Sequence, residues 1–304
     1  MKKLLTLFLS VVLLAGCTSA PAEQTPAETA APEAQPITVL CPTGAPAVAL
    51  LPAYSNEKIT IENVDGADLL QAAFVNPEHQ YDVIIAPSNL GAKLAAAGKS
   101  DYKMLAVVTW GNLYMVKNDD VAEPKTIALF GEGAVPGLVY EAVIGSDENC
   151  TYYNAVTDAQ AALLSGNADM AMLAEPAATA TIAKGKEQGK NFSICADLQE
   201  TWGEGGYPQA ALFVLADKYE ENKTAYTDLL TSMAEYNKAF NAEQVVADIE
   251  AVGAEKLGVP NAQIISKVYD RLGINIVPAA DAEEALNKFV GMFGVESLEN
   301  VILK

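Results

Sequence analysis

The chain offers few side chains for proton transfer or covalent catalysis. Its only histidine, His79, lies in the loop Asn76-Pro77-Glu78-His79, a setting that predicts a surface residue and not the base of a nucleophilic triad. Two Ser-x-x-Lys matches, beginning at Ser55 and Ser100, run into strand-like sequence instead of opening a helix, and no Lys-Thr-Gly motif accompanies them. One histidine and scattered cysteines cannot build a zinc shell. We therefore predict no catalytic residue, no metal and no cofactor.

Hydrogen-bonding residues and glycines occur instead in short segments that follow strand-like runs, where they could bind a small molecule. In the first half of the chain these segments are Thr43-Gly44-Ala45, Ser88-Asn89 and Thr109-Trp110-Gly111-Asn112. Hydroxyls and amides can bond a ligand directly, and loop glycines let backbone amides approach it closely. The same residues could serve only as helix caps and turns, so the pattern leaves both roles open.

Two further segments of this kind lie in the second half. Gly131-Glu132-Gly133-Ala134 follows a strand-like run and opens a helix, but it lacks the Lys-Ser/Thr of a P-loop and a full G-x-G-x-x-G. We predict that its backbone N–H groups face a polar ligand atom. Glu175 ends another run, and Pro176 suits the first position of a helix. Glu175 and Pro176 could therefore serve as a helix start, as a ligand contact, or as both.

Aromatic side chains flank the same segments. A planar ligand could stack on the ring face of Trp110, Trp202 or Tyr207. Gln209 lies close to Tyr207 in the sequence and is a further candidate ligand contact. Packing around a hinge is the alternative role for these rings.

Alternating strand and helix patterns must position these segments. Strands are predicted at 37–40, 58–63, 81–86 and 104–109, with helices between them at 46–51, 66–74 and 89–97. A second series places strands at 126–130, 151–156, 168–174 and 192–196, with helices after Gly133, at 158–165 and at 176–188.

This alternation predicts an α/β fold of two lobes, each a mostly parallel sheet flanked by helices. We assign residues 37–115 and 210–304 to lobe 1 and residues 116–209 to lobe 2, with strand-like hinge segments at 113–117 and 210–216. The largely helical sequence after Tyr219 is expected to pack on lobe 1. Open α/β sheets bind ligands beyond the carboxyl ends of their strands, so the segments named above should face a cleft between the lobes.

A resemblance to a known family supports this architecture. The stretch GNADMAMLAEP, from Gly166 to Pro176, resembles the G-x-x-D-x-A-x-x-x-E-P pattern of substrate-binding proteins for sulfonates, nitrate and thiamine pyrimidine precursors, the group often called NMT1-like or SsuA-like. TWGNLY at 109–114 and GGYPQA at 205–210 look like that group's segments near the hinge. The resemblance runs from about residue 37 to about residue 222, and the order and spacing of the motifs carry it together.

The resemblance implies a type II periplasmic-binding fold with a ligand held in the cleft between two lobes. It also implies an extracytoplasmic substrate-binding component of an ABC importer, which acts as a monomer and has a small molecule and a membrane permease as partners. A lyase of the chorismate-dehydratase kind and an adhesion or sensor lipoprotein are the alternatives from other classes. Export argues against the lyase, because its substrate is cytosolic.

The charges of the candidate segments bear on the ligand. The segments contain Glu132 and Glu175 but no Lys or Arg, so an anion would depend on helix N-termini and neutral donors. We therefore expect a planar, neutral or cationic heterocycle, with a sulfonate- or nitrate-type anion as the alternative.

The N-terminus predicts export and a lipid anchor. Lys2 and Lys3 precede an apolar run at 4–15 that is too short to span a membrane, and the run ends in Leu14-Ala15-Gly16-Cys17. LLAGC resembles the lipobox of bacterial lipoprotein signals, which predicts a signal at 1–17 and acylation of Cys17. Residues 18–36, rich in Pro, Ala and Glu, should form an extended, disordered tether. The mature chain is thus expected outside the cytoplasmic membrane, attached only by its lipid.

Charge and the remaining cysteines exclude other functions. The chain has 19 basic and 39 acidic residues, a net charge of −20, so it should repel nucleic acids and anionic membrane surfaces. Cys41, Cys150 and Cys195 lack the spacing of a redox or zinc motif. We expect them to be small buried apolar residues, with a disulfide between at most one pair.

Overall fold

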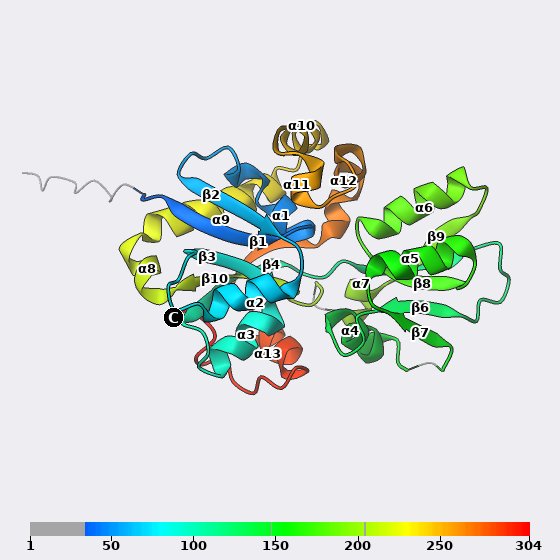
Figure 1. Cartoon of the computed structure of the whole chain (residues 1–304), viewed down its shortest axis with the longest axis horizontal. Helices are drawn as coiled ribbons and strands as arrows, with labels where there is room; N and C mark the ends of the chain where they lie inside the picture. The colour runs from blue at the N-terminus through cyan, green and yellow to red at the C-terminus, as the bar shows by residue number, and fades with distance from the viewer. Residues whose placement is uncertain (1–33, 147, 204) are drawn as a thin grey trace, which may run out of the picture. The chain divides into compact units, whose positions relative to one another are not determined.

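A computed structural model describes residues 34–146, 148–203 and 205–304. The predicted export signal, its Cys17 and most of the predicted tether lie outside the described residues. The described chain contains two β-sheets, called sheet A and sheet B below, and each is covered by helices on both faces (Figure 1). None of the helices in this part of the chain is both long and apolar enough to cross a membrane.

Sheet A has six strands in the order β11-β4-β10-β3-β1-β2. Its parallel part consists of β1 (Ile37–Pro42), β2 (Ile59–Val64) and β3 (Val83–Pro87). Its antiparallel part consists of β10 (Ala210–Leu215), β4 (Tyr102–Thr109) and the edge strand β11 (Ile274–Pro278).

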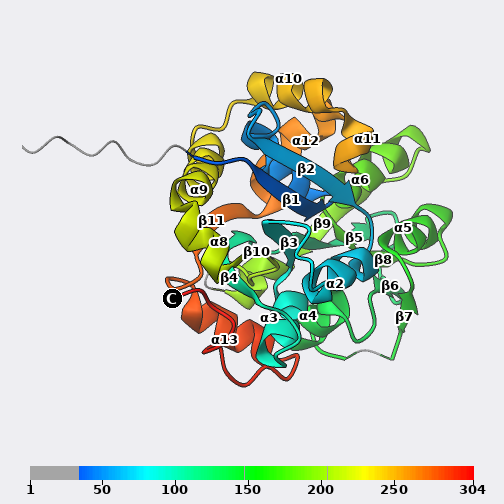
Figure 2. The same ribbon diagram turned by 60° about the vertical axis from the view of Figure 1, so that its left-hand side comes forward.

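The strands of sheet A are buried on both faces because apolar side chains point both ways. In β3, Val83 and Ile85 belong to one apolar core and Ile84 and Ala86 to another. The first core is closed by α1 (Ala45–Ala49), η1 (Leu51–Ala53), α9 (Lys223–Lys238), α10 (Ala242–Val252), α11 (Ala254–Leu257) and α12 (Ala262–Val268). The second is closed by α2 (Ala67–Val75), α3 (Ser88–Ala96) and α13 (Glu283–Gly291), and Figure 2 shows these two layers from a second side.

Sheet B has five strands in the order β7-β6-β8-β5-β9. They are β5 (Leu113–Asn118), β6 (Ile127–Phe130), β7 (Cys150–Tyr153), β8 (Met170–Ala174) and β9 (Phe192–Asp197). One face packs on α5 (Val156–Ser165) and α6 (Ala177–Glu187), and the other on α4 (Val135–Val143) and α7 (Leu198–Trp202).

The predicted α/β fold of two helix-covered sheets is confirmed, and most strands of each sheet run in one direction. Each sheet is mixed, because β5 and β10 run antiparallel to both of their neighbours. These are also the two runs that we predicted as hinge segments. Each lies entirely within one sheet, and the chain leaves sheet A at residues 110–112 and returns to it between α7 and β10.

The C-terminal region packs on sheet A, with α9, α10 and α12 on one face and α13 on the other. α8 (Ala216–Glu221) connects β10 to these helices. β11 was not predicted from the sequence; it is a short run that ends in Pro278 within a largely helical region. It occupies an edge of sheet A, where a proline interrupts no ladder on its outer side.

The turn before β11 contains Arg271, which contacts a residue of the candidate site described below. Asn261 caps α12 by accepting a hydrogen bond from the amide of Ile264. The helix runs into η2 (Tyr269–Leu272), and Gly273, at φ 65°, ends that turn. Arg271 lies within η2.

Candidate functional site

Residues from both sheets line a cavity of about 300 Å³. This volume is at the lower end of the range for small-molecule pockets. The residues contributed by the sheet A region are Pro42, Thr43, Gly44, Ala45, Pro46, Pro87, Gln209 and Ala210. Those near or in sheet B are Asn112, Leu113, Phe130, Pro136, Ala174 and Glu175.

The cavity lies where the strand-end rule predicts. Pro42 and Pro87 are the last residues of the parallel strands β1 and β3, and Phe130 and Ala174 are the last residues of β6 and β8. Parallel strands present their carboxyl ends at one edge of a sheet, so the loops that follow them converge there. Of the predicted site residues, the cavity lining includes Thr43, Gly44, Ala45, Asn112, Glu175 and Gln209.

Thr43 is fixed by a neighbouring acid and a neighbouring glycine. Its hydroxyl donates to Asp65 Oδ1 at 2.5 Å, which leaves only lone pairs on the Thr43 oxygen for another partner. A Cβ on Gly258 would lie 2.4 Å from Thr43 Cβ, so only glycine allows the segment after α11 to approach so closely. The amide of Gly44 donates to the carbonyl of Leu257 at 2.8 Å. The C-terminal region thus holds this part of the cavity wall.

Buried polar atoms gather at the ends of β3 and β4 and the start of β10. Ser88 Oγ, Asn89 Oδ1, Thr109 Oγ1 and Gln209 Oε1 are buried and have no hydrogen-bond partner among the described residues. The backbones are adjacent, because Ser88 N donates to the Gln209 carbonyl and Gln209 N to the Thr109 carbonyl, both at 2.9 Å. A buried polar group without a partner lowers the stability of the fold by about 1–3 kcal/mol. A hydrogen-bonding partner for these four atoms would therefore be stabilising.

Two side-chain amides connect this layer to sheet B. Gln209 Nε2 donates to Asn112 Oδ1 at 3.2 Å, and Asn112 Nδ2 donates to the carbonyl of Glu175 at 3.0 Å. Because that carbonyl can only accept, Asn112 must present its NH₂ group to it and its oxygen to Gln209. Gln209 is thereby oriented with Oε1 as a free acceptor.

Glu175 forms an ion pair with Arg271, which lies in η2. Arg271 Nε lies 2.9 Å from Glu175 Oε1, and the side chains of Glu175 and Arg271 are 0% and 35% exposed. Thr179 completes the group: its hydroxyl donates to Glu175 Oε1 at 2.8 Å and accepts from Arg271 Nη2 at 2.7 Å. The Thr179 amide donates to Glu175 Oε2 at 3.1 Å. Both oxygens of this carboxylate therefore accept at least one hydrogen bond.

Arg271 was not predicted from the sequence. It corrects the expectation that no basic residue lies near the candidate segments. The candidate segments contain no basic residue, yet the fold brings Arg271 to Glu175 from 96 positions away. The signal that could have found it is physical: a buried carboxylate needs a cation or several donors nearby. The linear sequence gives no indication of which basic residue supplies it.

The predicted aromatic platform is not part of the cavity wall. Trp110 is 8% exposed, and its indole N–H donates to the carbonyl of Asn275 at 2.9 Å. Tyr207 is fully buried and stacks on Phe289 at 5.5 Å between ring centroids, with Trp202 edge-on at 5.7 Å. Burial raises the pKa of the Tyr207 phenol well above its usual range. These rings pack where the chain passes between the sheets, and among the cavity-lining residues the aromatic one is Phe130.

Two predicted glycine segments also lie outside the cavity lining. The carbonyl of Gly131 accepts hydrogen bonds from Ala134 N at 3.0 Å and Gly137 N at 3.1 Å, so the 131–134 loop folds on itself. Glu132, Gly133 and Ala134 are exposed. Gly111, at φ 86°, is buried, and a Cβ there would lie 2.7 Å from atoms of Gln199 and Tyr207. Its small size serves packing between the sheets.

The resemblance motif has mostly structural contacts. Gly166 ends α5 in the left-handed conformation, with φ 82°. Asp169 Oδ2 accepts from the amides of Lys125 and Thr126 at 2.9 and 3.0 Å, which joins the segment before β8 to the start of β6. These hydrogen bonds lower the pKa of Asp169 below its usual value. Glu175 is the residue of the motif that reaches the cavity.

The remaining titratable residues lie elsewhere. His79 is 32% exposed and lies 3.3 Å from Asp101, as expected of a surface histidine. Cys41, Cys150 and Cys195 are all free thiols. The expectation of burial holds for Cys41, whose pKa burial raises, and is wrong for Cys195, which is exposed. No cluster of metal-ligating side chains is present among the described residues.

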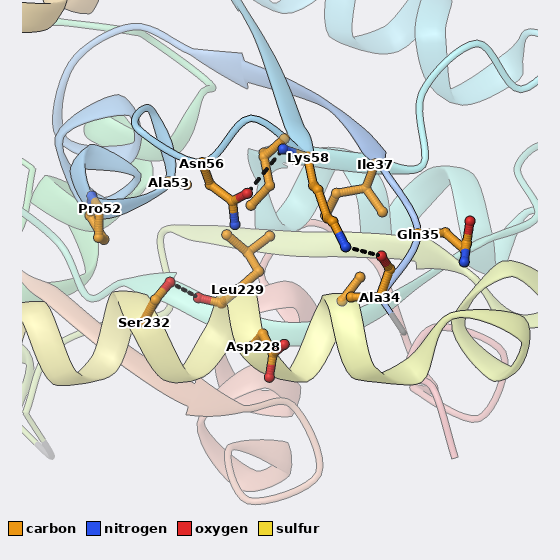
Figure 3. Close-up of a pocket in the computed structure, with 12 residues that line it drawn as sticks. Ala34, Gln35, Ile37, Pro52, Ala53, Asn56, Lys58, Asp228, Leu229 and Ser232 are labelled. Atoms are coloured by element: carbon orange, nitrogen blue, oxygen red, sulfur yellow. Dashed lines mark hydrogen bonds between the residues drawn. The ribbon is translucent and has the colours of Figure 1, made fainter. Parts of the chain in front are cut away.

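A second, smaller cavity lies at the opposite end of β1, between η1 and α9 (Figure 3). Its volume is about 180 Å³, and none of the predicted site residues lines it. Polar groups in its wall bond locally: Lys58 Nζ donates to the Ala34 carbonyl at 3.0 Å, and Ser232 Oγ donates to the Leu229 carbonyl at 2.8 Å. Its lining comes entirely from the sheet A region, so it does not join the two sheets.

Comparison with known proteins adds to this geometry. No protein-family model and no curated protein sequence matches the chain. An ABC transporter structure from Parabacteroides distasonis is similar, with a TM-score of 0.73, 20% identity and coverage of 89% of this chain and 97% of the other.

Two further solved structures are similar. The periplasmic aliphatic sulphonate-binding protein SsuA of Escherichia coli has a TM-score of 0.67 at 14% identity, covering 90% of this chain and 93% of its own. The periplasmic nitrate-binding protein NrtA of Synechocystis PCC 6803 has a TM-score of 0.57 at 12% identity, covering 86% and 81%. The chain therefore has the two-lobed, type II fold of the periplasmic binding proteins of ABC transporters.

Proposed function

We propose that this chain is the extracytoplasmic substrate-binding component of an ABC importer and holds one small molecule in the cavity between sheets A and B. The observation that carries the proposal is the cavity itself, which is lined from both sheets and includes Gln209, whose buried Oε1 has no partner among the described residues. Its fold, shared with ABC transporter binding proteins, supports the same role. A membrane permease is then the partner that receives the molecule.

The hydrogen-bonding groups favour a neutral ligand that donates. The proton of Thr43 is committed to Asp65, and Gln209 Oε1 is a buried acceptor without a partner among the described residues, so both offer lone pairs. Glu175 is neutralised by Arg271, and Arg271 is itself held by Glu175 and Thr179. A sulfonate or nitrate would meet acceptors here, whereas an N–H or O–H group would be bonded. The apolar remainder of the wall, mostly proline, alanine, Leu113 and Phe130, suits a heterocyclic or aliphatic body.

A thermal-shift panel tests this preference. Small neutral heterocycles and amides with N–H donors should raise the melting temperature, since a ligand at 100 times its Kd adds about 2.7 kcal/mol to folding stability. Gln209→Leu should lose most of that shift, because it removes the Oε1 acceptor, whereas Gln188→Leu on the exposed surface should keep it. Stabilisation by alkanesulfonates or nitrate alone would reverse the proposed ligand class.

An enzymatic role has little support in the cavity wall. Glu175 is the one titratable side chain among the cavity-lining residues of the described chain, and it is held in an ion pair with Arg271 and by hydrogen bonds from Thr179. General acid–base catalysis needs a group that can exchange a proton with the substrate. We therefore propose a binding protein and not a lyase.

The N-terminal sequence supports attachment at the cell surface. We propose that Cys17 carries the lipid anchor and that the folded part reaches the permease on its tether. A Cys17→Ser variant should appear in the soluble fraction of the culture or periplasm. Continued partitioning with membranes would exclude this anchor.

A further inference from the structure

We infer that Arg271 is a positioning residue that holds the cavity closed by joining η2 to the end of β8. This inference deepens the proposed function, because a binding protein of this kind must pass between open and closed arrangements of its lobes. It concerns the protein before any ligand binds.

The first support is that Arg271 bonds the sheet B region through both its side chain and its backbone. The guanidinium contacts Glu175 and Thr179, which lie after β8 and in α6. The Arg271 carbonyl accepts from the Tyr114 hydroxyl at 3.2 Å, and Tyr114 lies in β5. Burial and the nearby Asp197 carboxylate raise the pKa of Tyr114 well above its usual range, so it stays a donor at neutral pH.

The second support is that the partner carboxylate has no alternative. Glu175 is fully buried, and its contacts are Arg271 and Thr179. Separation of η2 from β8 would remove the one cation of the described chain that is bonded to this carboxylate and leave it with only the two donors of Thr179. Breaking one partner away from a buried ion pair is strongly unfavourable, whereas Arg271, about one-third exposed, can regain water. The cost of opening therefore falls on Glu175.

The third support is the connection between this group and the ligand-binding wall. The carbonyl of Glu175 accepts from Asn112, which in turn accepts from Gln209. A ligand that bonds Gln209 therefore contacts the same chain of hydrogen bonds that Arg271 completes. Ligand binding and the ion pair should consequently stabilise the same closed arrangement.

The test measures the distance between the two lobes in the ligand-free protein. Spin labels at Thr60→Cys in β2 and Thr157→Cys in α5, both exposed positions, report that distance by pulsed dipolar spectroscopy. Cys150 and Cys195 are replaced by serine in this background, and Cys41 is buried and unlabelled.

Arg271→Gln should shift the distance distribution to longer values and broaden it, and Arg271→Lys, which keeps the charge, should give an intermediate shift. The control is Lys117→Gln, which breaks an ion pair of similar length (3.0 Å to Asp119) within the sheet B region and should leave the distribution unchanged. If Arg271→Gln fails to fold, Thr179→Val, which removes the hydroxyl bridge without exposing a bare charge, should still broaden the distribution.

Superimposable distributions for wild type, Arg271→Gln and Thr179→Val would overturn the inference. No ligand enters this measurement, so the ligand class proposed above can fail in the thermal-shift panel while this result stands, and the reverse also holds.

Discussion

Two carboxylates of one short motif do different things in this molecule. Asp169 is bonded to backbone amides and a hydroxyl at the start of β6, so it fixes strands within sheet B. Glu175 lies at the cavity and is bonded to Arg271 from the C-terminal turn. The motif thus combines one residue that builds a sheet with one that borders the site.

The role of Asp169 predicts a pH-dependent loss of stability. Its pKa is lowered in the folded state from an ordinary value of 3.8, chiefly by the amide hydrogen bonds of Lys125 and Thr126. A lowered carboxylate pKa contributes stability above the unfolded value, and that contribution is lost as pH falls through the folded value. Asp169→Asn should therefore lower the urea midpoint at pH 7 and have a much smaller effect at pH 3.

The matched control for this prediction is Asp228→Asn, an exposed carboxylate on α9. It should leave the midpoint almost unchanged at both pH values. An equal loss for Asp169→Asn at pH 7 and pH 3 would mean that the carboxylate charge has no part in holding β6 to β8.

Close backbone contacts hold the segments that connect the sheets. A Cβ on Gly206 would lie 2.1 Å from the carbonyl oxygen of Trp110, and one on Gly273 would lie 2.0 Å from that of Gly111. The outgoing connection, the returning connection and the turn before β11 therefore pack on one another with no room for a side chain. These contacts set the position of Asn112, which lies in the outgoing connection.

This packing predicts different outcomes for two adjacent glycines. Gly205 and Gly206 both have positive φ, 80° and 107°, but a Cβ on Gly205 meets no atom within 4 Å. Alanine at either position carries the same kind of backbone strain, and only Gly206→Ala adds the overlap with Trp110. Overpacking costs about 1–3 kcal/mol, which is about 2–5 °C in Tm for a chain of this size.

Differential scanning calorimetry of both variants measures this difference. Gly206→Ala should melt below Gly205→Ala by that amount. Equal melting temperatures would show that the connections can separate without cost, contrary to the packing described above.

Hydrophobic periodicity predicted most strands and helices. The features that it did not predict, strand direction and β11, have physical causes. Apolar runs at 81–86 and 168–174 identified β3 and β8 because buried strands need apolar side chains on both faces. Strand direction was not predictable, because a run such as AALFVL in β10 looks the same whether its neighbours are parallel or antiparallel. β11 was missed because an edge strand with a terminal proline gives a weak signal.

The site was predictable only where it follows from strand ends. That rule identified Thr43, Asn112 and Glu175 among the cavity-lining residues. It could not identify Arg271, which reaches the site from a turn between a helix and an edge strand. The rings of Trp110 and Tyr207 were assigned to a ligand platform because composition alone does not distinguish a ring that faces a cavity from one that packs beneath it.

At the scale of the whole molecule, the two helix-covered sheets of this acidic chain line a cavity from both sides. Its wall comes from regions that are far apart in the sequence: the ends of β1 and β3, the connections between the sheets, the end of β6 with the start of α4, and the end of β8. Such a wall exists only when the full described chain is folded. Binding of a small molecule there should therefore depend on the cavity and on no other hollow of the molecule.

Native mass spectrometry of the protein purified without denaturation from its own host tests this claim most directly. We expect one small neutral molecule per chain, lost in Ala174→Leu, which fills the cavity between the sheets, and retained in Ser232→Leu, which fills the cavity between η1 and α9. A molecule that remains bound to Ala174→Leu but leaves Ser232→Leu would contradict it.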